Sequence, residues 1–150
     1  MVSENEGLTW RSCAVPAPGI AWYGLALNPG NPATALAATS LGVFRSSDGC
    51  RSWTAIGNGL EQAATAEAVL FHPTRFGEAF AAQGGKVFRS MDGGQTWQPL
   101  DPGEGTNLWP SSLLILAAAP DRIFALVPGR GVFSTTASAE SAVTQYTLYR

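Results

Sequence analysis

The strongest indication of the fold of this 150-residue chain is the stretch Ser90-Met91-Asp92-Gly93-Gly94-Gln95-Thr96-Trp97. It recurs 44 residues earlier as the segment from Ser46 to Trp53, where Asp48 and Gly49 hold the places of Asp92 and Gly93. Two copies of one turn at this spacing indicate a repeated supersecondary unit that must stack on its neighbours to bury a core.

Weaker copies of the turn lie at both ends of the chain. Residues 3–10 form a degenerate copy, in which Asn5 replaces the aspartate, Glu6 replaces the first glycine, and Thr9 and Trp10 are kept. After Phe133, residues 134–140 lack both the Asp-Gly pair and the tryptophan. The period of the chain is therefore 43–45 residues, and its last turn has decayed.

Each period contains four short apolar or alternating segments separated by Gly, Pro or Asp turns, which predicts four strands. We call these strands a (23–28, 67–72, 113–118), b (34–39, 78–83, 122–127), c (42–46, 86–90, 131–134) and d (52–56, 96–100, 143–149). Residues 9–15 are predicted to add an extra N-terminal strand. A four-stranded antiparallel unit of this length is typical of a β-propeller blade. The prediction is one all-β domain over residues 1–150, with repeats at about 16–56, 57–100 and 101–150.

The repeated turn joins strands c and d, and its residue types predict how it is stabilised. The aspartate side chain can accept hydrogen bonds from the backbone N–H groups that follow it, and glycine allows the left-handed backbone there. The hydroxyl before the tryptophan adds a bond, and the indole ring packs on the blade. One carboxylate per turn is too few for Ca²⁺, so no metal is predicted. The residues expected to have this structural role are Ser46, Asp48, Gly49, Trp53, Ser90, Asp92, Gly93, Thr96 and Trp97.

These turns resemble the Asp-box (BNR) repeats of sialidases, xyloglucanase-type glycoside hydrolases, sortilin-like receptors and photosystem-assembly propellers. The resemblance extends over nearly the whole chain and implies a propeller whose Asp boxes lie away from any active site. It implies no single function, because enzymes and non-enzymes share the turn. A sialidase site is not expected, since the chain has no Arg-Ile-Pro element and its tyrosines are Tyr23, Tyr146 and Tyr149.

Three blades cannot close a ring, because propellers have at least four. An open stack exposes apolar blade faces and sheet edges, which promotes association. We expect either a homodimer that completes a six-bladed ring or a piece of a larger propeller.

Composition excludes several classes of partner. The net charge is −2 and the nine Lys and Arg residues are scattered, so nucleic acid is not an expected partner. No apolar run reaches the length of a membrane span, and the N-terminus lacks the features of a signal peptide. The chain as given is expected in the cytoplasm, or outside the cell if it is part of a longer protein. Cys13 and Cys50 are expected as free thiols, with a disulfide as the alternative, and no cofactor is predicted.

The d–a loops and b–c turns share the propeller face opposite the Asp boxes, and variable loops on a rigid scaffold commonly carry binding residues. The candidates for ligand binding there are Trp22, Glu61, Gln83, Asn107, Trp109 and Arg130. Both tryptophans have core packing as an alternative. His72 is assigned to turn chemistry before Pro73, and Arg45 and Arg89 to structural roles beside the Asp boxes.

Two functions follow from this face. The first is a non-catalytic scaffold or binding module that recognises a protein or a glycan. The alternative is a glycoside hydrolase in which Glu61 and Glu104, 43 residues apart, act as an acid–base pair on carbohydrate. Whether the chain is an enzyme stays open, with a non-enzyme favoured, because both carboxylates are more simply explained as solvated loop residues.

Overall fold

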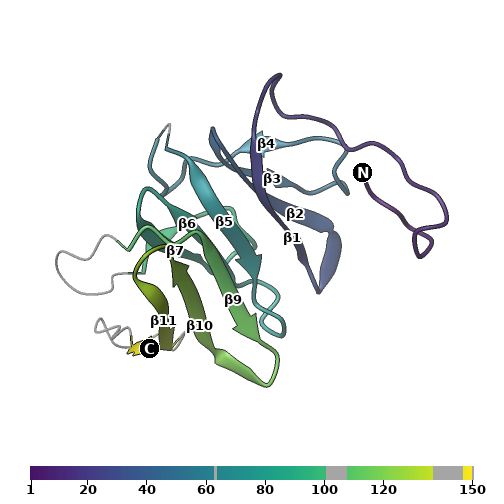
Figure 1. Cartoon of the computed structure of the whole chain (residues 1–150). Helices are drawn as coiled ribbons and strands as arrows, with labels where there is room; N and C mark the ends of the chain where they lie inside the picture. Colours follow the sequence, from purple (N-terminus) through teal and green to yellow (C-terminus); the bar gives the residue numbers. More distant parts are fainter. Residues whose placement is uncertain (63, 101–107, 137–146, 150) are drawn as a thin grey trace.

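A computed structural model describes residues 1–62, 64–100, 108–136 and 147–149, and it shows three four-stranded antiparallel sheets (Figure 1). The first sheet contains β1 (Trp22–Asn28), β2 (Asn31–Thr39), β3 (Gly42–Ser46) and β4 (Thr54–Ala55). The second contains β5 (Ala66–Phe71), β6 (Ala79–Gln83), β7 (Lys86–Ser90) and β8 (Gln98–Pro99). The third contains β9 (Ser112–Leu116), β10 (Ala119–Val127), β11 (Gly131–Thr136) and β12 (Thr147–Tyr149).

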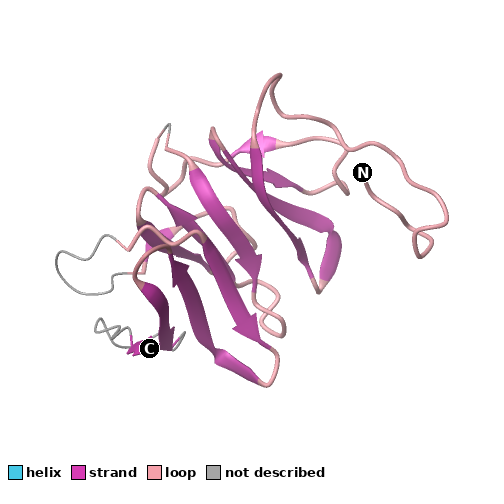
Figure 2. Ribbon diagram, viewed as in Figure 1, coloured by secondary structure: helices cyan, strands magenta, loops and turns pink. Residues whose placement is uncertain are grey.

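Each sheet is a simple meander whose strands pair in chain order, as in a propeller blade. The sheets stack in sequence: β5 contacts β1 and β2, and β9 contacts β5 and β6. The described residues consist of strands and loops (Figure 2). Predicted strands a, b and c are confirmed in all three repeats. Strand d is shorter than predicted, at two residues in the first two blades, and residues 143–146 lie outside the described residues.

The blades share one pairing register. An alanine of strand b faces a phenylalanine of strand c in each: Ala37 with Phe44, Ala81 with Phe88, and Ala125 with Phe133. Alanine in strand b leaves room for neighbouring sheets to pack closely across it. One core cluster, which includes Leu36, Val69, Phe71 and Trp97, lies between the first two blades. Phe80 and Ile123 lie between the second and third, with Leu70, Leu113 and Ile115 packed against them.

The predicted strand at residues 9–15 is wrong, and the N-terminal segment instead forms a hairpin. Its single β-bridge joins Val2 to Arg11. The Asp-box hairpins of the first two blades have the same spacing, pairing Arg45 with Thr54 and Arg89 with Gln98. Residues 2–11 thus have the geometry of a c–d hairpin from a further blade. Beyond Arg11 the segment turns toward Cys50, so it has no strand partner.

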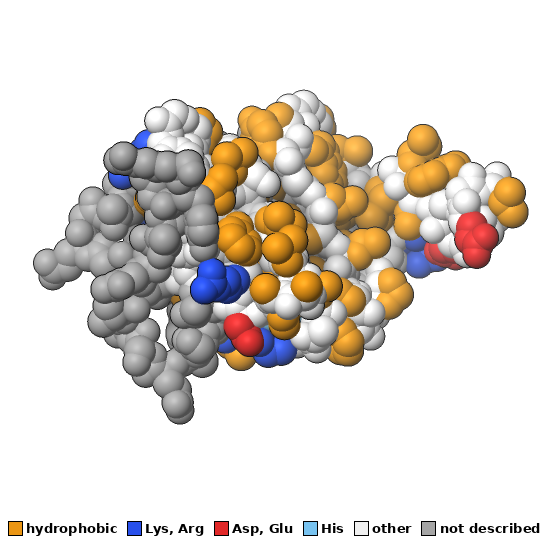
Figure 3. All heavy atoms as spheres, turned by 60° about the horizontal axis from the view of Figure 1, so that its bottom comes forward, with side chains coloured by type: hydrophobic (Ala, Val, Ile, Leu, Met, Phe, Trp, Pro, Cys, Tyr) orange, Lys and Arg blue, Asp and Glu red, His pale blue; other side chains and the backbone are white. Residues whose placement is uncertain are grey.

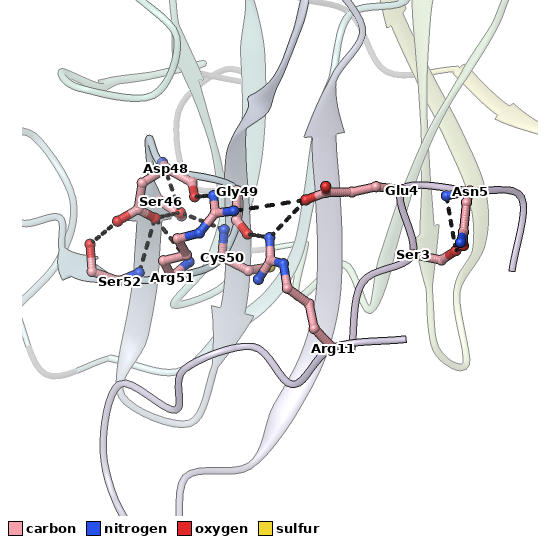
Figure 4. Close-up of polar contacts among 10 residues, drawn as sticks. All are labelled: Ser3, Glu4, Asn5, Arg11, Ser46, Asp48, Gly49, Cys50, Arg51 and Ser52. Atoms are coloured by element: carbon pink, nitrogen blue, oxygen red, sulfur yellow. Dashed lines mark hydrogen bonds and ion pairs between the residues drawn. The ribbon is translucent and has the colours of Figure 1, made fainter. Parts of the chain in front are cut away.

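The two complete Asp boxes have the same hydrogen bonds, as predicted, and Figure 4 shows those of the first box. Oδ1 of Asp48 accepts from Ser46 Oγ at 2.8 Å and from Ser52 N at 2.9 Å, while Oδ2 accepts from Ser52 Oγ at 2.6 Å. Asp92 repeats these bonds with Ser90 and Thr96 at 2.8, 2.9 and 2.6 Å. Trp97 is buried, whereas Trp53 is half-buried.

The N-terminal copy keeps this geometry with an amide. Asn5 Oδ1 accepts from Ser3 Oγ at 3.1 Å and from Thr9 N at 2.9 Å, and its Nδ2 donates to Thr9 Oγ1 at 2.9 Å. The only difference is that Asn5 Nδ2 donates the last of these bonds, whereas the carboxylate oxygen of Asp48 or Asp92 accepts it. Glu6 occupies the glycine position with a φ of 57°, so the turn forms despite the cost of a left-handed non-glycine residue.

Hydrogen bonds of one repeated pattern also connect successive blades. Arg45 Nε donates to Gly93 O of the next Asp box at 2.9 Å, and Arg11 donates to the equivalent carbonyl of Gly49. Near the a–b turns, Asn28 Nδ2 donates to Phe76 O at 2.7 Å, and His72 Nε2 lies 2.9 Å from Pro120 O.

His72 is fully buried, and its Nδ1 accepts from the backbone N–H groups of Thr74 and Arg75. This arrangement makes Nε2 the protonated nitrogen that donates to Pro120. The histidine therefore has the structural turn role expected from the sequence, because its polar atoms are used within the fold.

We predict that His72→Asn is tolerated, because Asn28 makes the same bond one blade earlier. His72→Ala leaves Pro120 O unpaired and opens a cavity, and it should lower the free energy of unfolding by about 2 kcal/mol. Urea unfolding of the two variants and the parent measures both effects. Equal destabilisation by both substitutions would contradict the proposed equivalence of the two positions.

The Asp boxes also predict a response to acid. Burial opposes ionisation of Asp92, but the bonds from Thr96 and Ser90 outweigh it and hold its pKa at about 2, below the ordinary 3.8. Bonds led by that from the Ser52 side chain also lower the pKa of Asp48. A carboxyl with a lowered folded-state pKa contributes stability above its unfolded pKa, and this contribution is lost as the pH falls from 3.8 toward 2.

Asp92→Asn should retain the turn, as Asn5 does, and should lose that pH dependence. Asp92→Ala should lose the turn's bonds and about 1 to 2 kcal/mol at neutral pH. Thermal unfolding at a series of pH values distinguishes the two. The same acid dependence in parent and Asp92→Asn would show that the carboxylate bonds are not its source.

Candidate functional site

An exposed tryptophan stands on the loop face between the second and third blades. The backbone N–H groups of Leu108 and Trp109 donate to Gly85 O at 2.9 and 3.2 Å. Trp109 has a φ of 51°, and its side chain is 58% exposed. A Cβ added to Gly85 would lie 2.9 Å from the indole ring, so glycine allows the ring to rest on the turn. A strained backbone that presents an aromatic side chain to solvent is typical of a binding site.

Two more predicted residues meet at the same b–c turn. Glu61 N donates to Gln83 Oε1 at 3.2 Å, and Gln83 Nε2 donates to Ala64 O at 2.8 Å. Gln83 is buried and its amide bonds position the loop, while its role as a ligand contact stays a prediction. Glu61 forms an ion pair with Lys86 at 2.8 Å. The structure thus brings Glu61, Gln83 and Trp109 together around this turn.

The remaining predicted residues lie apart from this cluster or outside the described chain. Trp22 packs edge-on against Trp53, with ring centroids 5.4 Å apart, in a pocket beside the N-terminal segment. Arg130 lies over the Phe133 ring at 5.7 Å. Asn107 and Glu104 lie outside the described residues, so the pairing of Glu61 with Glu104 stays a prediction.

A second pocket on this face is centred on Glu67. It has a volume of about 250 Å³ and is lined by Tyr23, Thr65, Glu67 and Ser111. Tyr23, Glu67 and Ser111 are spaced by 44 residues at or beside the start of the innermost strand of each blade. The repeat therefore places one residue of each blade at the same end of the axis around which the blades are arranged.

The carboxyl of Glu67 is unusual within this pocket. Desolvation by burial raises its pKa, and its buried Oε2 has no hydrogen-bond partner within the described chain. A desolvated carboxyl that lines a pocket with one oxygen unpaired is a candidate for a functional group. The sequence places Glu67 at the start of a predicted strand and gives no reason to include it among the candidate site residues. The 44-residue spacing between Tyr23 and Glu67 is the sequence signal that could have placed Glu67 near the axis of the blades.

The described residues limit other chemistry. In this part of the chain, no group of three or more His, Cys, Asp or Glu side chains is arranged to hold a metal ion. Its secondary structure includes no helix of the length and apolarity needed to cross a membrane. The polar groups of the site are thus a carboxyl, hydroxyls and a lysine–glutamate pair.

Solved structures share this fold. An ancestral GH74 enzyme matches with a TM-score of 0.68 and 17% identity, over 85% of this chain and 18% of that one. YCF48 from Cyanidioschyzon merolae matches with a TM-score of 0.68 and 16% identity, over 88% of this chain and 41% of that one. An auxiliary nutrient-binding protein from Bacteroides thetaiotaomicron matches with a TM-score of 0.61 and 10% identity, over 83% and 30%.

These matches show that the chain has the fold of Asp-box β-propellers, over most of its length. It spans less than half the length of each of these structures. No family model and no curated protein matches the sequence. Proteins of this fold include both hydrolases and non-catalytic binding or assembly proteins, so the fold leaves the function to be argued from the site.

Proposed function

We propose that this chain is a non-catalytic β-propeller module that binds a glycan on its loop face. The observation that carries the proposal is the Glu67 carboxyl, whose buried Oε2 has no hydrogen-bond partner within the described chain, in a pocket with the hydroxyl-bearing residues Tyr23, Thr65 and Ser111. A carboxylate accepts hydrogen bonds from sugar hydroxyls, and serine and threonine hydroxyls both donate and accept. The exposed Trp109 adds an aromatic surface on which a sugar ring can pack.

The glycoside hydrolase alternative has less support. General acid–base cleavage of a glycosidic bond needs two carboxyl groups, roughly 5 to 9.5 Å apart, facing one bond. Among the described lining residues of the Glu67 pocket there is one carboxyl, and Glu61 is paired with Lys86. Binding requires no second carboxyl.

The binding proposal is tested with a glycan array, followed by calorimetry on the glycans that bind. Trp109→Ala and Glu67→Ala should each weaken binding at least tenfold, through loss of the aromatic surface and of the acceptor. Met91→Ala, at an exposed residue in an Asp-box turn on the opposite face, is the control. The absence of glycan binding, or equal affinity in all variants, would contradict the proposal. If peptides bound instead, as in the YCF48 structure with a D1 peptide, the ligand would be a peptide and not a glycan.

Glu67 should also reduce stability, as binding groups often do. A carboxyl whose pKa is raised by folding destabilises the fold as the pH rises above its unfolded value of about 4.5. Glu67→Gln should therefore increase the free energy of unfolding at pH 7, and the gain should disappear below pH 4. Urea unfolding at both pH values measures this, and a loss of stability at pH 7 would show that the carboxylate has a partner.

We also propose that the chain associates with itself through its two end blades. Leu25 and Leu27 of β1 are 54% and 50% exposed, whereas the equivalent Val69 and Phe71 of β5 are 8% and 6% exposed because the first blade covers them. At the other end, Leu114, Leu116 and Leu126 are exposed. Figure 3 shows apolar side chains over much of one side of the molecule, with few charged groups among them.

A head-to-tail pair would cover both faces by placing the third blade of each copy against the first blade of the other. Light scattering should give twice the chain mass of 15.7 kDa, and Leu114→Glu should shift the population toward the monomer. Leu41→Glu, at an exposed leucine in a b–c turn, is the control. A parent protein that stays monomeric at high concentration would contradict self-association.

A further inference from the structure

The N-terminal segment enters the Asp box of the first blade. Ala14 N donates to Cys50 O at 2.9 Å, and the Trp53 indole donates to Ala14 O at 3.1 Å. In the other two boxes the indole bonds to the carbonyl of its own turn: Trp97 to Gly94 at 3.2 Å, and Trp10 to Gly7 at 3.0 Å. Ala14 has thus been inserted between Trp53 and the carbonyl that the indole normally bonds.

Cys50 occupies a position that is otherwise glycine. Gly94 and Gly7, its counterparts, have φ values of 86° and 88°, and Cys50 adopts the same left-handed backbone at 68°. A Cβ on Gly94 would lie 2.7 Å from Leu36 of the preceding blade, which explains glycine there. A non-glycine residue held in this conformation, where the repeat provides glycine, indicates a role for its side chain.

The side chain of Cys50 meets that of Cys13. Both cysteines line a pocket of about 250 Å³ with Met1, Trp22 and Trp53. Cys50 is buried, whereas Cys13 is partly exposed. Burial, followed by the hydrogen bond with the Cys13 thiol, raises the pKa of Cys50 to about 11. The backbone bond between Ala14 and Cys50 holds the two cysteines adjacent, as a disulfide requires.

We propose that Cys13 and Cys50 are a reversible thiol–disulfide pair that couples the N-terminal hairpin to the first blade. The oxidant is the disulfide of a small thiol compound, such as oxidised glutathione. When the pair is reduced, the segment at residues 13–15 is held by hydrogen bonds alone. When it is oxidised, a covalent bond fixes the segment to the Asp box.

The reaction proceeds by two exchanges. The thiolate of the accessible Cys13 attacks one sulfur of the small disulfide, which forms a mixed disulfide and releases one small thiol. The sulfur of Cys50, as thiolate, then attacks the Cys13 sulfur and releases the second small thiol. Two protein thiols are oxidised and one small disulfide is reduced to two thiols. Buried Cys50 has little thiolate, so it resolves the intermediate and does not start the reaction.

The test is mass spectrometry of the folded protein during incubation with oxidised glutathione. The parent should lose two hydrogen atoms in mass and retain no bound glutathione. Cys50→Gly restores the residue of the other two boxes, so it should fold and should accumulate one glutathione on Cys13. Cys13→Ala should react at least tenfold more slowly than the parent, because the remaining thiol is buried.

The consequence for the N-terminal segment is read from amide hydrogen exchange. In the oxidised protein, exchange of the Ala14 N–H should slow at least tenfold relative to the reduced protein, and dithiothreitol should reverse the change. The proposal is overturned if the intramolecular disulfide forms only in denaturant, if Cys50→Gly acquires no glutathione, or if oxidation leaves Ala14 exchange unchanged. None of these outcomes depends on glycan binding.

Discussion

A hydrogen bond from an arginine to an Asp-box carbonyl joins the first blade to the second, and another joins the N-terminal hairpin to the first blade. Inside the turn, the side chains of Asp48 and Asp92 bond the N–H groups and hydroxyls that follow them. This leaves the carbonyls of Gly49 and Gly93 available to the arginines that reach them, Arg11 and Arg45. The Asp box is therefore a hairpin turn whose carbonyl also accepts a hydrogen bond from the segment that precedes it in the stack.

The contact between the second and third blades is built differently, because the third blade has lost its Asp box. Arg89, the counterpart of Arg45, forms an ion pair with Glu78 at 2.6 Å, and the Glu78 side chain is fully buried. Arg75 also contacts Glu78 and reaches Asp121 of the third blade at 2.7 Å. A buried carboxylate needs such partners, since an unpaired buried charge costs several kcal/mol. At this contact, charged pairs therefore replace the hydrogen bond from an arginine to an Asp-box carbonyl.

Two positions with polar side chains in the first two blades carry other residues in the third. His72 is followed one period later by Leu116, and Arg89 by Ser134. The third blade thus has an exposed leucine, Leu116, where the first two blades carry Asn28 and His72 with bonds to the next blade. The exposed face of the third blade is therefore apolar, whereas the contacts between blades include hydrogen bonds and ion pairs.

Repeat spacing predicted what depends on local sequence: strands a, b and c, the Asp-box bonds and the turn role of His72. It failed where neighbouring blades decide the outcome. Residues 9–15 do not form a strand because the segment bonds Cys50 instead of a partner strand. Gln83 is buried by a loop that sequence cannot place, and Glu67 owes its raised pKa to burial in the stacked blades. Of the candidate site, Trp109 and Glu61 were predicted, whereas the Glu67 pocket was not.

One turn, repeated three times, organises the chain, and the degenerate copy at the N-terminus is one of the three. Amide hydrogen exchange measured residue by residue can detect each copy separately. The N–H groups of Thr9, Ser52 and Thr96 each donate to the Oδ1 atom of their own turn at 2.9 Å, so all three should be protected. Exchange of the Thr9 amide at the rate of an unstructured peptide, with Ser52 and Thr96 protected, would contradict the claim that the N-terminal copy forms a blade hairpin.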